Sequence, residues 1–117
     1  MATRSIEKTA WEDYLNHLTR ELGACLAEVE VAGLEIGDQV EADWVRLTGL
    51  SYDPKDDLVI IDLLSKDDKD FEHMVRKPTE LVVDEEAAGL TSLVVTDADG
   101  IRTILRLRKP LALPPAA

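Results

Sequence analysis

The chain has 117 residues and a net charge of −11, with 24 acidic against 13 basic side chains. Its length predicts one domain, and a 45% share of apolar residues is enough for a core. The negative charge disfavours nucleic acid as a partner, and no apolar run reaches the roughly 18 residues of a membrane span. With no signal peptide at the N-terminus, we expect a cytoplasmic protein without a membrane partner.

The N-terminal residues predict one helix. Residues 1–8 show no period and are expected to form a loose arm. A helix is predicted over residues 9–23, where the TAWE motif at Thr9 fits a capping box and Gly23 a C-terminal stop. Its apolar side chains recur at helical spacing and should pack on a sheet: Trp11, Tyr14, Leu15, Leu18 and Leu22.

Residues 39–64 organise the remainder of the chain. They are interpreted as two strands joined by a turn that begins at Asp53. The apolar residues of the first strand switch faces along its length, which requires bulges or bends. We expect one bend near Trp44 and another at Gly49. Such bends are typical of small barrels and strongly coiled sheets.

The rest of the chain completes the predicted fold. Segment 70–75 is interpreted as one or two helical turns before the fourth strand, stopped by Pro78. The fold class is therefore α+β, with the helix packed on a strongly bent antiparallel sheet, or small open barrel, of about five to six strands over residues 24–109. Residues 110–117 are expected to form a proline-rich tail.

The sequence of the last two strands and of the loop between them predicts how they pair. A two-residue loop would bring Arg102 into the apolar set, whereas a three-residue loop pairs Leu93 with Leu105. We expect the three-residue loop, with Gly100 at positive φ, where a Cβ would be penalised. Arg102 would then lie on the opposite face from Leu105.

Five segments together carry a family resemblance. They are the helix opening at Trp11 and the stretches EVEVAGLEIGDQVEADW, LTGLSYDPKDDL, HMVRKPTELVVDE and VTDADGIRTILRLRKPL. Over nearly the whole chain, they resemble an uncharacterised bacterial family of short acidic proteins, the DUF5335 family of unknown function. The resemblance implies a bacterial, single-domain, intracellular protein. It assigns no activity, cofactor or site residue.

Two acidic runs contain the carboxylates that hard cations prefer, at residues 53–70 and 97–100. The first matches no calcium loop and is interleaved with lysines. The second lacks the closing glutamate and lies between strands. The first is interpreted as solvated turn and loop acids and the second as a hairpin turn, so we expect no metal and no cofactor.

Trp44, Tyr52 and His73 are the candidates for a ligand-binding site, in a pocket between the helix and the sheet. A histidine could serve as a general base, but a recognisable serine or cysteine partner is missing, and packing or surface roles are the simpler interpretation. Cys25, the only cysteine, is interpreted as a buried, inert thiol. No catalytic residue is assigned.

The one basic cluster comprises Arg102, Arg106, Arg108 and Lys109, and its three arginines share a face of the last strand. Pairing with acids on neighbouring strands is the simpler interpretation, and a docking stripe for an acidic partner or a second copy is the alternative. We expect a non-enzymatic binding or self-association module, with a homodimer or another protein as partner. The alternative is a small ligand-binding protein or enzyme using the helix–sheet pocket.

Overall fold

The computed structural model describes residues 2–21, 25–33, 37–87 and 89–111. Within this part, a short 3-10 helix and one α-helix accompany eight strands: β1 (Ala2–Ser5), η1 (Lys8–Ala10), α1 (Trp11–Arg20), β2 (Leu26–Gly33), β3 (Gly37–Asp53), β4 (Leu58–Leu64), β5 (Asp70–Arg76), β6 (Pro78–Glu86), β7 (Gly89–Asp97) and β8 (Arg102–Leu111). Eight strands exceed the five to six expected, because β1 and β5 were not recognised as strands.

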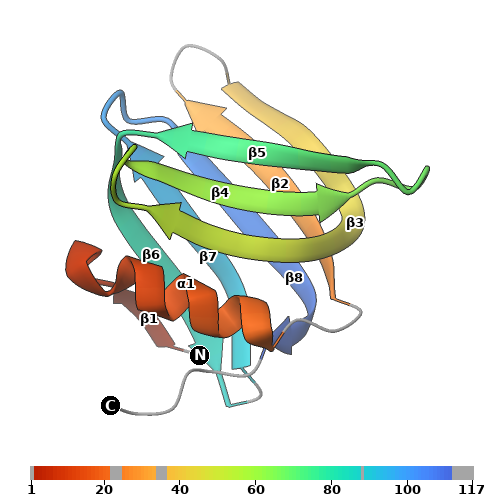
Figure 1. Cartoon of the computed structure of the whole chain (residues 1–117), viewed down its shortest axis with the longest axis horizontal. Coiled ribbons are helices and arrows are strands. Elements are labelled where there is room, and N and C mark those ends of the chain that lie inside the picture. The colour runs from red at the N-terminus through yellow and green to blue at the C-terminus, as the bar shows by residue number, and fades with distance from the viewer. Residues whose placement is uncertain (1, 22–24, 34–36, 88, 112–117) are drawn as a thin grey trace.

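All strands form one antiparallel sheet in the order β1-β6-β7-β8-β2-β3-β4-β5. The 17 residues of β3 pair first with β2 and then with β4, so this strand belongs to both halves of the sheet. Figure 1 shows β3, β4 and β5 crossing in front of β6, β7 and β8. The apolar core lies between the two halves, and the sheet remains open because β1 and β5 end the order.

Two irregularities in β3 allow the sheet to fold over. At Trp44, where φ is 51°, the pairing with β2 slips between Ala27 and Val29. At Gly49, the pairing with β4 slips again. A Cβ on Gly49 would lie 3.0 Å from an Asp62 carboxylate oxygen, so a side chain there would crowd β4. Both predicted bends are confirmed.

Helix α1 covers the core with the predicted face. Trp11, Tyr14, Leu15 and Leu18 are buried and belong to the core, while Leu22 lies outside the described residues. The Thr19 hydroxyl accepts a 2.9 Å hydrogen bond from the Leu50 amide, so the helix also satisfies the edge of β3 that faces away from β4. Neither helix in the described part combines the length and the apolarity required to cross a membrane.

The N-terminus differs from the prediction of a loose arm. Residues 2–5 pair with β6, from Ala2 opposite Glu85 to Ser5 opposite Val82. The α-helix begins at Trp11 after a 3-10 turn, and no side chain caps it, so the capping box at Thr9 is wrong. The start of the helix is held instead by Ile6, whose side chain is buried. The Ile6 amide donates a hydrogen bond to the Leu81 carbonyl, and its own carbonyl accepts one from the Trp11 indole. The stop at Gly23 lies outside the described residues.

Segment 70–75 is a strand, not the predicted helical turns. Val75 is buried, and Phe71 and His73 are half-buried, in alternation with the exposed residues Glu72 and Met74. This period of two belongs to a half-covered strand. Lys77, at φ 51°, leads directly from β5 into β6.

The β7–β8 hairpin has the predicted register. Leu93 pairs with Leu105, Gly100 has φ 81°, and Arg102 is exposed whereas Leu105 is fully buried. Two amides of the loop bind the Asp97 carboxylate. Strand β8 continues to Leu111, so the predicted tail begins later than residue 110, and residues 112–117 lie outside the described part.

Candidate functional site

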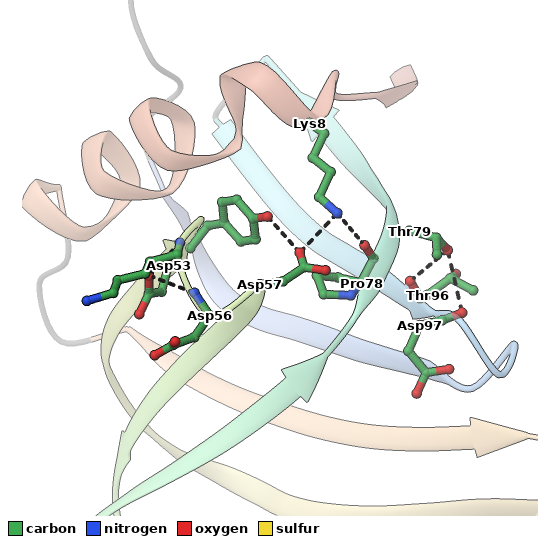
Figure 2. A network of polar contacts seen from close by, with 10 residues as sticks. Lys8, Asp53, Asp56, Asp57, Pro78, Thr79, Thr96 and Asp97 are labelled. Carbon is green, nitrogen blue, oxygen red and sulfur yellow. Dashed lines mark hydrogen bonds and ion pairs between the residues drawn. The ribbon is translucent and has the colours of Figure 1, made fainter.

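Tyr52 contacts a polar network in which Lys8 bridges Asp57 and the Pro78 carbonyl; Figure 2 shows these last three residues. Its hydroxyl donates a 2.7 Å hydrogen bond to Asp57, and Lys8 Nζ lies 3.0 Å from Asp57 Oδ1 and 3.0 Å from the Pro78 carbonyl oxygen. Burial, and then the Asp57 contact, raises the pKa of Tyr52 to about 12. The Tyr52 ring also packs edge-on against Trp11, at 5.2 Å between centroids. The network joins the helix entry, the β3–β4 turn and the start of β6.

Trp44 lies at the bulge of β3, and the Arg108 guanidinium stacks over its ring at 3.9 Å from the centroid. At this distance a cation–π contact is favourable. The contact uses two candidates that the sequence had assigned to different sites, one to a ligand pocket and one to a docking stripe.

His73 lines a cleft of about 510 Å³ between β5, the end of β2 and the β7–β8 hairpin. Its Nε2 lies 3.3 Å from the hydroxyl of the buried Thr103. Neither Trp44 nor Tyr52 is among the described residues that line this cleft. The three ligand-binding candidates therefore do not form one site.

The helix–sheet boundary holds a groove of about 440 Å³ at the C-terminal half of α1. Asn16 and Arg20 line it from the helix, and Thr48 and Asp62 from the sheet. None of the three ligand-binding candidates is among its described lining residues. Side chains other than the three candidates therefore line this groove.

Asp62 also lines an acidic cleft of about 600 Å³, together with Asp70 and Glu72. Partial burial, and then the charges of Glu72 and Asp70, raise the pKa of Asp62. Asp62 lies within β4 rather than in a turn, so the interpretation of residues 53–70 as solvated turns is wrong for this residue. In the part of the chain that the structure describes, no three histidine, cysteine or acidic side chains are grouped to hold a metal ion.

The three arginines have three different environments. Arg106 lies 2.9 Å from Glu28 and 2.8 Å from Glu30 on β2, and the Glu30 contact is the main cause of its raised pKa. Arg108 stacks on Trp44. Arg102 is exposed and has no ion pair among the described residues. Cross-strand pairing therefore explains Arg106 alone.

An aliphatic row on the outer face of the sheet was missed by the sequence analysis. Val82 pairs with Val94, and Val94 with Ile104, so the three side chains lie side by side across β6, β7 and β8. They are half-buried, while their neighbours Val83 and Leu105 are fully buried on the inner face. The sequence signal is a run of consecutive apolar residues in each strand, which indicates apolar side chains on both faces.

The outer face carries no described helix. The buried side chains of α1 belong to the core on the inner side, and Figure 1 places α1 on the same side of β6–β8 as β3–β5. Arg102 of β8 and Glu80 of β6 flank the aliphatic row in one cross-strand line, with Thr96 between them. Both charged side chains are exposed.

These features define a domain in which one antiparallel sheet folds over on itself and a single helix covers its core. The chain belongs to the DUF5335 family, a family of unknown function, whose family model matches residues 2–116. The predicted family resemblance is thus confirmed. The chain is 42% identical over 114 residues to an uncharacterized protein of the bacterium Aquifex aeolicus (strain VF5), covering 97% of this chain and 99% of the relative. No solved structure matches.

Proposed function

We propose that the protein is a non-enzymatic self-association module in which two copies pack through the outer faces of β6, β7 and β8. The observation that carries the proposal is the aliphatic row Val82–Val94–Ile104, which no described element covers. Contiguous apolar patches on a folded surface mark interaction sites. A second copy would supply the apolar surface that the row lacks.

The row is self-complementary about an axis along β7. A two-fold rotation about this axis would leave Val94 facing its own counterpart and place Ile104 over Val82 of the second copy. Two sheets packed in this way lie about 10 Å apart, with their strands roughly aligned. The arrangement is that of a β-sandwich built from two chains.

The charged residues that flank the aliphatic row are also complementary under the same two-fold rotation. Within one chain, Arg102 and Glu80 are separated by the intervening strand β7 and form no ion pair with each other. In the dimer, Arg102 of each copy would meet Glu80 of the other. Exposed ion pairs contribute at most about 1 kcal/mol each, so these pairs set orientation while the aliphatic row supplies affinity.

Replacing the central valine tests the proposal. Val94→Lys would place two ammonium groups together on the axis, so we expect the dimer to be lost. Sedimentation at tens of micromolar protein measures this. Met74→Lys is the matched control, because Met74 is 45% exposed on β5, at the opposite end of the sheet order from β6, β7 and β8. A native protein that sediments as a single 13.0 kDa species under these conditions contradicts the proposal.

A further inference from the structure

The free edge of β5 carries backbone groups whose direction can be worked out. Among the described strands, β5 pairs only with β4. Two backbone hydrogen bonds bracket this ladder, from Ser65 N to Lys69 O (2.9 Å) and from Lys77 N to Asp57 O (3.1 Å). Bonding alternates with a period of two along an antiparallel pair. Residues 71, 73 and 75 therefore bond to β4, and residues 72 and 74 direct their N–H and C=O groups to the free edge.

The 510 Å³ cleft runs beside this edge. Val31 of β2 and Thr103 of β8 line it from the inner face of the opposite half of the sheet, together with Ile101, which precedes β8. His73 and Val75 line it from β5. The cleft thus combines the apolar side chains of Val31 and Ile101 with one wall that offers backbone donors and acceptors. Its remaining lining includes charged side chains at the end of β5 and in the β7–β8 hairpin: Arg76, Lys77, Asp97 and Asp99. Its volume lies in the range of about 300–1,000 Å³ that ligand sites occupy.

We propose that this cleft binds an extended polypeptide segment, which adds to β5 as a further antiparallel strand. An extended chain presents donors and acceptors at the same two-residue spacing as the edge, and this match is the basis of peptide recognition by strand addition. Side chains of the added strand that point inward would contact Val31 and Ile101. The site differs from the sheet-face dimer contact, because its backbone edge belongs to β5 and the residues that line it from β2 and β8, Val31 and Thr103, lie on the inner face of the sheet.

The charges on β5 specify the segment. Glu72 and Arg76 are exposed on the outward face of the strand. Opposite charges favour each other across neighbouring strands. An antiparallel segment would carry an acid opposite Arg76, apolar residues opposite Val75 and His73, and a base opposite Glu72. From its N-terminus, the bound segment would therefore have the order acidic residue, apolar residue, any residue, apolar residue, basic residue.

A blocked peptide of sequence SEVTVKS is the probe, and amide NMR of the native protein is the measurement. We expect saturable shifts centred on the amides of Glu72 and Met74, with slower exchange of these two protons. The peptide SKVTVES, which exchanges the two charges, should bind more weakly. Equal binding of both peptides, or shifts confined to another surface, would overturn the proposal.

A proline on the edge gives the second test. Because the Met74 amide points away from β4, Met74→Pro leaves that ladder intact while removing a donor from the free edge. Affinity for SEVTVKS should fall about tenfold or more, the equivalent of one hydrogen bond, whereas Met74→Ala retains it. Equal binding by the two variants, with unfolding midpoints that agree, argues against strand addition. Concentration-dependent protection of the same amides without peptide would instead assign the edge to a second copy and overturn the peptide proposal.

Discussion

Arg4 joins the N-terminal strand to the sheet through a two-point contact with Glu85. The Arg4 Nε and Nη2 atoms lie 2.6 and 3.1 Å from the two carboxylate oxygens, and the Tyr14 hydroxyl donates a 2.9 Å hydrogen bond to the same carboxylate. The Arg4 hydrogen bond is the main cause that lowers the pKa of Glu85 below its usual value of 4.5. All three contacts bind the ionised form, so protonation weakens them together.

This pKa shift predicts a pH-dependent stability. A carboxylate with a lowered folded-state pKa stabilises the fold above its unfolded value of 4.5, and the contribution is lost as the pH falls through the folded value. Glu85→Gln should therefore reduce the decline of the unfolding free energy below pH 4.5, measured by urea titration at several pH values. Glu12→Gln is the control, since Glu12 is exposed on α1. Equal declines in the native protein and Glu85→Gln would contradict this role.

The proposed dimer predicts a charge exchange. Arg102→Glu should weaken self-association, because it places like charges opposite each other, and adding Glu80→Arg should restore it. Sedimentation of the single and double variants measures the difference. Lys55→Glu, an equal change of charge in the exposed β3–β4 turn, should have little effect. A double variant that associates no better than Arg102→Glu would exclude the proposed two-fold arrangement.

The direction of Arg102 was predictable and the partners of Arg106 were not. The first depends on a three-residue loop and on alternation, both of which are local properties of the sequence. The second depends on the register between β8 and β2, and the Glu28 partner of Arg106 is 78 residues away. The composition shows that the chain has many acidic residues, but it does not show which of them lies opposite Arg106. The stacking of Arg108 on Trp44 was missed for the same reason.

Helix α1 offers a direct test of core packing. Leu18 is fully buried against the core, so Leu18→Ala should reduce the unfolding free energy by about 2–5 kcal/mol. Asn16→Ala, at an exposed position of the same helix, should change it by less than about 0.5 kcal/mol. Urea unfolding measures both. A midpoint that does not move in Leu18→Ala would mean that this side chain contributes little to the core.

Among the elements, β3 was predictable in detail and β5 was not. The apolar residues of β3 change parity twice, and only bends at Trp44 and Gly49 reconcile them with one core. The sequence of β5 is compatible with two patterns. A helical spacing would place Phe71, Met74 and Val75 on one face, and a strand spacing would place Phe71, His73 and Val75 on one face. Pairing with β4 decides between the two patterns. β1, with four residues, is too short to show any period.

For the whole molecule, the net charge of −11 opposes association of two copies. The screening length is about 8 Å at physiological ionic strength and about 30 Å at 0.01 M. We therefore expect the native dimer to weaken when salt is removed, although its local ion pairs alone would strengthen. Sedimentation at the two ionic strengths measures this. Stronger association at low salt would indicate that the Arg102–Glu80 contacts outweigh the overall repulsion.

The sheet order has a consequence for how the chain reaches its fold. β2 lies between β3 and β8, and Leu26 pairs with Arg108, while Ala2 at one edge pairs with Glu85. A chain emerging from the ribosome therefore cannot complete the ladder between β2 and β8 until β8 has been synthesised. Folding rates fall as contacts join residues more distant in sequence, so refolding should be slow for a domain of this size. Until β8 is available, the edge of β2 that pairs with β8 has no partner strand, and an unpaired strand edge favours aggregation.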